Sequence, residues 1–261
     1  MRIKVSSFFI LASFLLTCGT IYATPIVYGV TFNTDGQAGF IDIATGAFTV
    51  VGTVGSSNFI NDVAFAPNGT LYAISNTDEL VTINIWNGAV TAVMPVPGLE
   101  TLVFTPSGVL YAASQSALYT IDLTAHTTTE IGPYGTLGNA QNIRFDASGN
   151  LYTTDTGTPT NVFLVNTSTG QATYEFNVPF GAVSLGEADG RLYGVGISGI
   201  GGTLNLVWVD PATHTGTQTL SSFPSVDFSE PFSGGFVPEP GALSLCGLGL
   251  AALVFRSRKR A

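Results

Sequence analysis

The chain has 261 residues, of which 45% are hydrophobic and only 10% charged, and its net charge is −9. Two basic and sixteen acidic residues lie between Thr24 and Phe236, so this body has a net charge of −14. Nucleic acid and anionic lipid headgroups repel a body with this charge. Its expected partners are therefore cations and neutral polymers. The same charge also keeps an exported protein soluble.

The N-terminal segment, 1–23, has the features of a secretory signal peptide. Arg2 and Lys4 precede the apolar stretch Val5–Leu16, and Ala23 offers a small residue before a cut ahead of Thr24. Residues 1–23 are therefore predicted to be removed by signal peptidase. A lipoprotein cleavage site at Cys18 is the alternative, although Thr17 is an unusual residue before a lipidated cysteine. With Cys18 gone and Cys246 beyond it, the body has no cysteine for a disulfide or a nucleophile.

The body, predicted to span residues 24–236, consists of repeats. One pattern, an apolar strand, a turn ending in Gly and then Leu-Tyr, occurs at Phe65–Tyr72, Phe104–Tyr111, Phe145–Tyr152 and Leu185–Tyr193. Tyr28 supplies a fifth copy of the tyrosine, and the turn glycines follow one another at nearly equal intervals, at Gly69, Gly108, Gly149 and Gly190. A second turn follows an alternating strand in each unit, at 42–46, 84–88, 122–126, 166–170 and 210–214. The sequence thus contains five units of about 40 residues.

Each unit has room for four short strands, because apolar residues alternate with period two between turns rich in Asn, Asp, Ser and Gly. No stretch of the body has helical periodicity with caps. Four strands in every unit of this length predict an all-β fold, a single β-propeller of five blades. A sandwich would not repeat its turns in register, and β-solenoid coils usually recur at shorter periods. The Leu-Tyr repeats resemble those of YVTN and NHL-type propellers.

The first unit lacks the strand and Gly turn that precede Leu-Tyr in the other units. The segment Val226–Gly235 has the same order of strand and turn as Val63–Gly69. It is therefore predicted to complete the first blade from the C-terminal side and to close the ring, which leaves no long open edge.

Polar residues precede the Gly-turn strand, which in a propeller is usually the innermost strand. Asn61, Asp62, Glu100, Gln141 and Asn142 are expected to ring one mouth of the central channel, with 181–182 and 224–225 completing the ring. Carboxylate and amide oxygens suit Ca²⁺. The set resembles the channel ligands of calcium-dependent lactonases, and this resemblance implies a Ca²⁺ cofactor. The alternative is that these side chains cap strand ends and hold channel water.

Other side chains carry weaker signals. The repeated tyrosines are expected to pack in the core, and His126 and His214 to be solvated turn residues. Trp86 and Trp208 are the candidates for stacking on carbohydrate. The sequence has no Gly-x-Ser-x-Gly elbow and no Gly-rich loop leading into a helix, so no catalytic residue is assigned.

The C-terminal segment, 237–261, combines three features. The motif Pro238-Glu239-Pro240 leads into the uncharged apolar run Gly241–Phe255, and the chain ends with four basic residues, Arg256, Arg258, Lys259 and Arg260. A helix of this length is shorter than the roughly 30 Å hydrocarbon core, so the span is marginal. The positive-inside bias keeps the basic end cytoplasmic and the body outside. A buried C-terminal helix of the body is the alternative, but such a helix would show polar residues at helical spacing.

These features resemble the PEP-CTERM sorting tail of bacterial envelope proteins. In that family exosortase, a membrane transpeptidase-like enzyme, is thought to recognise the Pro-Glu-Pro motif during export. The resemblance implies an exported protein that is anchored in the inner membrane and then released to the cell surface or outside.

Two functions are compatible with these observations. The first is a non-enzymatic envelope protein whose propeller binds extracellular polysaccharide, as the sorting-tail family suggests. The second is a calcium-dependent hydrolase, lactonase or lyase with its site in the channel. The fold alone does not decide between them, because propellers host both.

Overall fold

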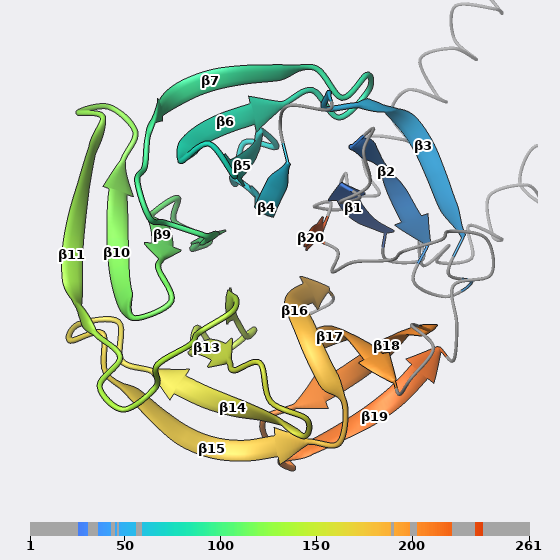
Figure 1. Cartoon of the computed structure of the whole chain (residues 1–261), viewed down its shortest axis with the longest axis vertical. Coiled ribbons are helices and arrows are strands. Elements are labelled where there is room, and N and C mark those ends of the chain that lie inside the picture. Colours follow the sequence, from blue (N-terminus) through green and yellow to red (C-terminus); the bar gives the residue numbers. More distant parts are fainter. Residues whose placement is uncertain are drawn as a thin grey trace, which may run out of the picture.

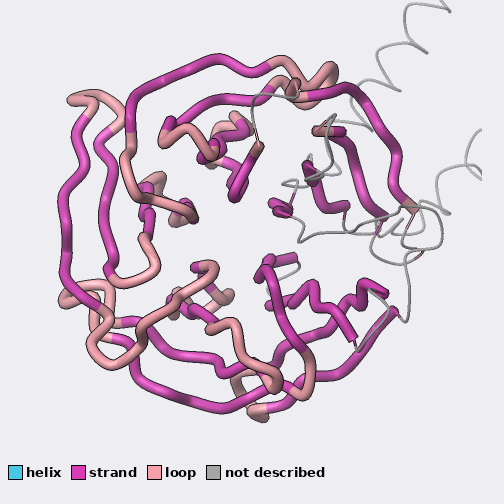
Figure 2. The backbone as a smooth tube through the Cα atoms, in the orientation of Figure 1, coloured by secondary structure: helices cyan, strands magenta, loops and turns pink. Residues whose placement is uncertain are grey.

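The computed structural model of the chain describes residues 26–30, 36–42, 45, 47–55, 59–188, 191–198, 203–220 and 233–236. These residues form twenty strands in five four-stranded antiparallel sheets, arranged as the blades of one propeller (Figure 1). No helix occurs among them (Figure 2). The predicted all-β fold, with five blades of four strands, is confirmed.

Each blade runs from an inner strand near the axis to an outer strand at the rim (Figure 1). Blade 1 contains β20 (Ser233–Phe236), β1 (Ile26–Val30), β2 (Gln37–Asp42) and β3 (Phe48–Thr53). Blade 2 contains β4 (Ile60–Phe65), β5 (Leu71–Ser75), β6 (Glu79–Ile83) and β7 (Val90–Pro95). Blade 3 contains β8 (Thr101–Phe104), β9 (Leu110–Ala113), β10 (Ala117–Asp122) and β11 (Thr127–Pro133). Blade 4 contains β12 (Ile143–Phe145), β13 (Leu151–Thr154), β14 (Thr160–Val165) and β15 (Ala172–Val178). Blade 5 contains β16 (Gly181–Ala188), β17 (Arg191–Ser198), β18 (Thr203–Asp210) and β19 (Thr215–Leu220).

The ring closes as predicted, with a strand from the C-terminal side of the body in blade 1. Strand β20 pairs antiparallel with β1, Val27 opposite Phe236 and Val30 opposite Ser233. The expected position of the turn was wrong, because Gly234 and Gly235 are strand residues that pair with Gly29 and Tyr28. Two adjacent glycines suggest a turn in a sequence. Here Gly235 lies opposite the repeated tyrosine, as do Ala64 in blade 2 and Gly186 in blade 5.

The second turn of every unit has one local cause. Its first residue is Asp or Asn, whose side-chain oxygen accepts backbone N–H bonds from two or three residues further on. Asp122 Oδ1, for example, accepts from the N–H groups of Thr124 and Ala125 at 2.8 and 2.9 Å. The bond from Ala125 and then that from Thr124 lower the pKa of Asp122. Equivalent bonds are made by Asp42, Asn84, Asn166 and Asp210.

The hydrophobic core lies between neighbouring blades rather than in one centre. Separate clusters of buried side chains fill the spaces between blades 1 and 2, 2 and 3, 3 and 4, and 4 and 5. The repeated tyrosines contribute as predicted: Tyr72 and Tyr111 pack on Phe104 and Phe145 of the following blade, with ring centroids 5.4 and 5.6 Å apart. Tyr28 is fully buried and packs edge-on against Phe65 of blade 2. Aromatic pairs therefore join blades 1 to 4.

Candidate functional site

The polar residues predicted to ring the channel lie at the starts of inner strands, but they differ in burial and in hydrogen bonding. Asp62 and Asn142 are buried, whereas Asn61, Glu100 and Gln141 are half-buried. The Glu100 carboxylate accepts a hydrogen bond from Gln115 Nε2 at 3.0 Å. Of the remaining predicted positions, Gly181 begins β16, the side chain of Ala182 is outside the described part of the chain, and so are residues 224–225.

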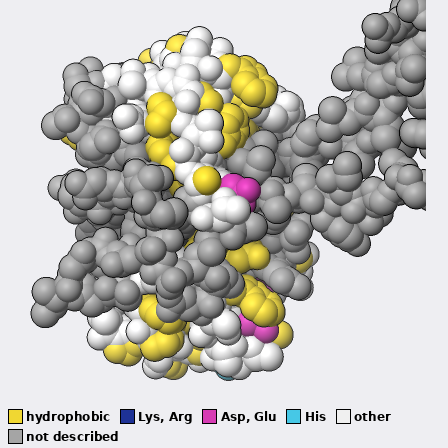
Figure 3. All heavy atoms as spheres, turned by 90° about the vertical axis from the view of Figure 1, so that its right-hand side faces the viewer, with side chains coloured by type: hydrophobic (Ala, Val, Ile, Leu, Met, Phe, Trp, Pro, Cys, Tyr) yellow, Lys and Arg dark blue, Asp and Glu magenta, His cyan; other side chains and the backbone are white. Residues whose placement is uncertain are grey.

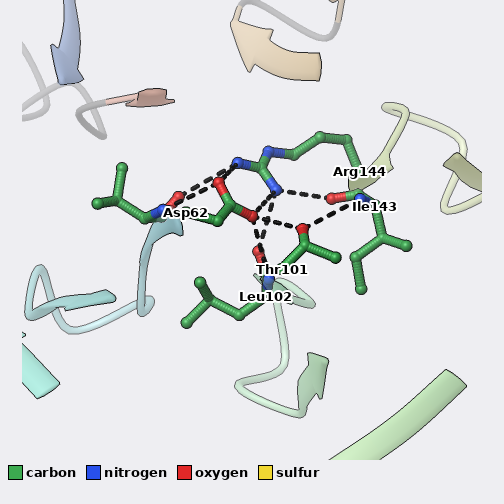
Figure 4. Close-up of polar contacts among 6 residues, drawn as sticks. Asp62, Thr101, Leu102, Ile143 and Arg144 are labelled. Atoms are coloured by element: carbon green, nitrogen blue, oxygen red, sulfur yellow. Dashed lines mark hydrogen bonds and ion pairs between the residues drawn. The ribbon is translucent and has the colours of Figure 1, made fainter. Parts of the chain in front are cut away.

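Asp62 is held by an arginine from two blades away. Arg144 of β12 spans the channel and forms a bidentate pair with the carboxylate, Nη2 to Oδ1 at 2.5 Å and Nη1 to Oδ2 at 2.9 Å (Figure 4). Both side chains are almost fully buried, at 5% and 0% exposure. Asp62 also accepts bonds from Thr101 Oγ1 at 2.5 Å and from the N–H groups of Val63 and Leu102.

The guanidinium of Arg144 is satisfied on its other sides by backbone oxygens. Its Nη1 donates to the carbonyls of Ile143 and Leu102 at 2.7 and 3.0 Å, and its Nη2 donates to Val63 O at 3.2 Å. Thr101 Oγ1 in turn accepts the N–H of Ile143. This network, the central clasp, joins the inner strands of blades 2, 3 and 4. Breaking a buried pair of this kind leaves an uncompensated charge in the interior, so the clasp fixes how these blades meet.

Sequence reasoning predicted a channel position for Asp62 and missed Arg144 as its partner. A signal was present, because the residues equivalent to Arg144 in the inner strands of the other blades are small or β-branched: Ala64, Val103, Gly186 and Gly235. Arg144 is thus the only long, charged side chain at this position of the repeat, in a body whose net charge is −14. That contrast could have indicated an arginine with a partner in the channel. Of the two carboxylates that the sequence predicted for a metal, Asp62 is thus paired with this cation.

Asn142 differs from Asp62, because its Oδ1 is buried and accepts no hydrogen bond from the described residues. Thr154 Oγ1 on the neighbouring strand β13 is in the same state. An unsatisfied buried oxygen is costly unless water or an ion contacts it. Among the residues that the structure describes, no group of three or more His, Cys, Asp or Glu could hold a metal ion.

A hollow of about 630 Å³ opens where the inner strands of blades 2, 3 and 4 end. We call it the central hollow. Phe65, Phe104 and Phe145, the last residues of β4, β8 and β12, line it together with Pro67 and Pro106. Arg144 also lines it, so the hollow reaches inward to the central clasp. Its walls are mainly apolar and come from equivalent positions of three blades.

Trp86 is the most exposed large hydrophobic residue that the structure describes, at 74% exposure. It lies in the turn between β6 and β7, where its backbone N–H donates to Asn84 Oδ1 at 2.9 Å. Beside it is a second hollow of about 460 Å³, the tryptophan hollow, whose lining includes Thr70, Thr82, Asn84 and Thr91. Residues with indole, hydroxyl and amide groups thus line one hollow.

The turn that carries Trp86 is fixed by backbone packing against blade 1. A Cβ at Gly88 would lie 2.7 Å from Thr53 N, and one at Gly52 would lie 2.0 Å from Asn87 O. Only glycine permits this approach, and Gly88 also has φ of 75°. The ring of Phe40 lies 6.2 Å from that of Trp86. A platform held in this way loses little conformational entropy when a ligand stacks on it.

Trp86 has no counterpart in the other blades, unlike the tyrosines. The third residue of the equivalent turn is Ala44, Thr124, Ser168 or Ala212. The exposed indole of Trp86 is therefore not part of the packing that the five blades share. Trp208, the other predicted stacking residue, is half-buried in β18 and pairs with Tyr193 across the sheet.

The two histidines occupy the position that glycine fills in the turns of blades 2 and 4. His126 and His214 have φ of 53° and 55°, an uncommon backbone conformation for residues other than glycine. Both side chains are exposed, as predicted for turn residues. His214 is nevertheless stacked on Phe176 of blade 4, with centroids 5.1 Å apart and planes at 8°. It therefore contributes to the contact between blades 4 and 5.

The comparisons with known proteins identify the tail and the fold. Residues 236–259 match the PEP-CTERM protein-sorting motif. The structure is similar to a chain in the crystal structure of a nidogen/laminin complex, with a TM-score of 0.56 and 12% identity over 83% of this chain and 99% of that one. It is also similar to TolB from Acinetobacter baumannii, with a TM-score of 0.50 and 15% identity over 75% of this chain and 52% of that one. No curated protein matches the sequence.

The chain is thus a five-bladed β-propeller that carries a PEP-CTERM sorting motif. The motif implies an exported protein that exosortase sorts and that a C-terminal anchor holds in the membrane before processing. None of the described residues forms a helix suited to crossing a membrane. The predicted apolar helix at 241–255 and the signal peptide at 1–23 lie outside the described residues.

Proposed function

We propose that the protein is a non-enzymatic component of the cell envelope whose propeller binds neutral extracellular polysaccharide. The observation that carries this proposal is Trp86, an exposed indole on a fixed turn beside hydroxyl and amide groups. Indole faces stack on the C–H faces of sugar rings, while hydroxyl and amide groups bond to sugar hydroxyls.

The charge of the body selects the kind of polysaccharide. Acidic residues outnumber basic ones by sixteen to two, and Arg144, one of the two, is paired with Asp62. The charged side chains that can be seen among the described residues in Figure 3 are acidic, with no Lys or Arg in view. A uronic acid or sulfated polymer would be repelled by this body, whereas a neutral polymer would not.

Affinity electrophoresis of the full chain in mild detergent tests the proposal. The gels contain a neutral β-glucan, a galactomannan or a xylan, with alginate as the acidic comparison. At least one neutral polymer should retard the protein, and Trp86→Ala should weaken binding by about tenfold, which corresponds to about 1.4 kcal/mol. Tyr174→Ala is the matched control, since Tyr174 is an aromatic residue of blade 4 at 52% exposure that lines neither hollow. Equal retardation of Trp86→Ala and wild type would overturn the proposal.

A calcium-dependent hydrolase, lactonase or lyase is the second candidate, and the unsatisfied Oδ1 of Asn142 is what favours it. The other predicted ligands are Asn61, Glu100 and Gln141, since Asp62 is paired with Arg144. Calcium at 100 times its Kd would add about 2.7 kcal/mol to the free energy of unfolding. A rise in Tm with calcium that chelator reverses and Asn142→Ala removes would support this candidate, and equal Tm values with calcium and with chelator would reject it.

A further inference from the structure

The tryptophan hollow and the central hollow are separated by one tight turn. This turn, Ala66–Thr70, joins β4 to β5, and it is closed by bonds from Ala66 N to Thr70 O at 2.9 Å and from Gly69 N to Ala66 O at 2.8 Å. Ala66 and Pro67 line the central hollow, whereas Gly69 and Thr70 line the tryptophan hollow. Two sides of a single hairpin turn therefore form walls of both hollows.

The distance between the hollows follows from strand spacing. Trp86 lies in the turn between β6 and β7, and Pro67 lies in the turn between β4 and β5 of the same sheet. Neighbouring strands lie about 4.8 Å apart, so the two turns are roughly 10 Å apart. Both turns are at the same end of the blade, because strands β4 and β6 run in the same direction. A linear oligosaccharide can span this distance.

The two hollows offer chemistry that suits different parts of one ligand. Three phenylalanines and two prolines of the central hollow present apolar surface, and Thr105 and Ser148 add hydroxyl groups. Among the described residues that line it, the only carboxylate is Asp146, which accepts bonds from Ser148 N at 2.9 Å and from Asn150 N at 2.8 Å. The only cation among the same residues, Arg144, is neutralised by Asp62. The described lining therefore offers no free cation to pair with an acidic ligand.

We infer that the two hollows are subsites for one extended neutral glycan, which crosses the Ala66–Thr70 turn between Trp86 and the central hollow. This inference rests on the function proposed above and adds to it the length of the ligand. Binding at two linked subsites raises the affinity for a long chain without changing the affinity for a short one that reaches only Trp86.

Two substitutions at one turn position of different blades test this inference. Ser148 lines the central hollow, whereas Ser107, at the equivalent position of blade 3, does not. The Ser148 contact within its turn is made by its backbone N–H, so Ser148→Trp fills the hollow without removing that bond. The probes are the neutral polysaccharide that retards the wild type and the disaccharide of the same repeat, with Kd measured by calorimetry.

Ser148→Trp should weaken binding of the polymer at least tenfold and leave the disaccharide unchanged, while Ser107→Trp should change neither. Trp86→Ala should weaken both. If Ser148→Trp binds the polymer as the wild type does, the two-subsite inference is wrong although Trp86 still binds glycan. If the central hollow binds gelatin, a polypeptide probe, and Ser148→Trp abolishes that binding but not polymer binding, the occupant is a peptide and the inference is also wrong. Loss of the proposed function itself would appear differently, as equal binding by Trp86→Ala and wild type.

Discussion

The channel and the turn between β6 and β7 each contain one residue that departs from the five-fold repeat. Arg144 replaces a small or β-branched residue on an inner strand, and Trp86 replaces a small residue in a turn. Arg144 is 4% exposed and its guanidinium donates five hydrogen bonds to oxygens of described residues, whereas Trp86 is 74% exposed. A departure that is buried must have its polar atoms hydrogen-bonded inside the fold, while one that is exposed can be reached by a ligand.

The largest expected effect on stability is that of Arg144→Met. It leaves Asp62 as an unpaired buried carboxylate, which costs about 3–5 kcal/mol. At about 2–4 °C per kcal/mol, the Tm measured by calorimetry should fall by roughly 10 °C. The double variant Asp62→Leu/Arg144→Met should melt at a higher temperature than Arg144→Met alone. A double variant that melts lower would show that the pair is not the main contribution of Arg144.

Blades 3 and 4 approach each other closely at Gly132 and Gly170, and replacing Gly170 tests how much this approach contributes to stability. A Cβ at Gly170 would lie 2.1 Å from Gly132 O, and Gly170 has φ of 78°. Gly149 has a similar φ of 83°, but no described atom lies within 4 Å of a Cβ built there. Gly149→Ala should therefore cost about 1–2 kcal/mol from backbone strain alone.

Gly170→Ala carries the same strain and also forces the blades apart, so its free energy of unfolding in urea should be lower than that of Gly149→Ala. Equal losses for the two variants would show that the close approach of Gly132 and Gly170 contributes nothing.

Replacing His126 or His214 should have a smaller effect on stability, and the two variants can be compared because both residues occupy the same position of the repeat. Replacement by glycine relieves the positive φ at either position, but at position 214 it also removes the stack on Phe176. An aromatic pair contributes about 0.5–1.5 kcal/mol. His126→Gly should therefore melt at or above the wild-type Tm, and His214→Gly should melt below His126→Gly. The reverse order would mean that the stack does not contribute.

The smallest effect concerns the buried hydroxyl of Tyr28, which bonds to no described residue. Burial raises the pKa of Tyr28 from 10.0 to about 12. Because the folded protein holds the phenol neutral, this group's contribution is fully present below pH 10.0 and is lost as the pH rises toward about 12. Tyr28→Phe should keep the stability at pH 7 and shift alkaline unfolding, followed by circular dichroism, to higher pH. An unchanged alkaline midpoint would contradict this assignment.

The fold was largely predictable from the sequence because its repeats are local. The Gly of each hairpin and the Asp or Asn of each second turn act within a few residues, and the tyrosine recurs at fixed spacing. The register of the closing strand was less accessible, because Gly234 and Gly235 signal a turn locally but pair with Gly29 and Tyr28 through ring closure. Local rules do not contain that long-range constraint.

The site was predictable only in part, for a related reason. Sequence position indicated that Asp62 and Asn142 lie where inner strands begin and that Trp86 is in a turn. The partner of Asp62 is 82 residues away, and its approach depends on the width of the channel. The two hollows depend on how neighbouring turns sit in space, which strand periodicity does not specify.

Acrylamide quenching of Trp86 fluorescence shows whether glycan contacts this indole. The chain contains two tryptophans, so Trp208→Phe makes Trp86 the only one. Free protein should be quenched readily, because the indole is 74% exposed. Addition of the neutral polysaccharide that retards the wild type in gels should reduce the quenching constant and shift the emission to shorter wavelength. An unchanged quenching constant in the presence of saturating polymer would show that Trp86 does not contact glycan, and the account of this turn as a binding platform would be wrong.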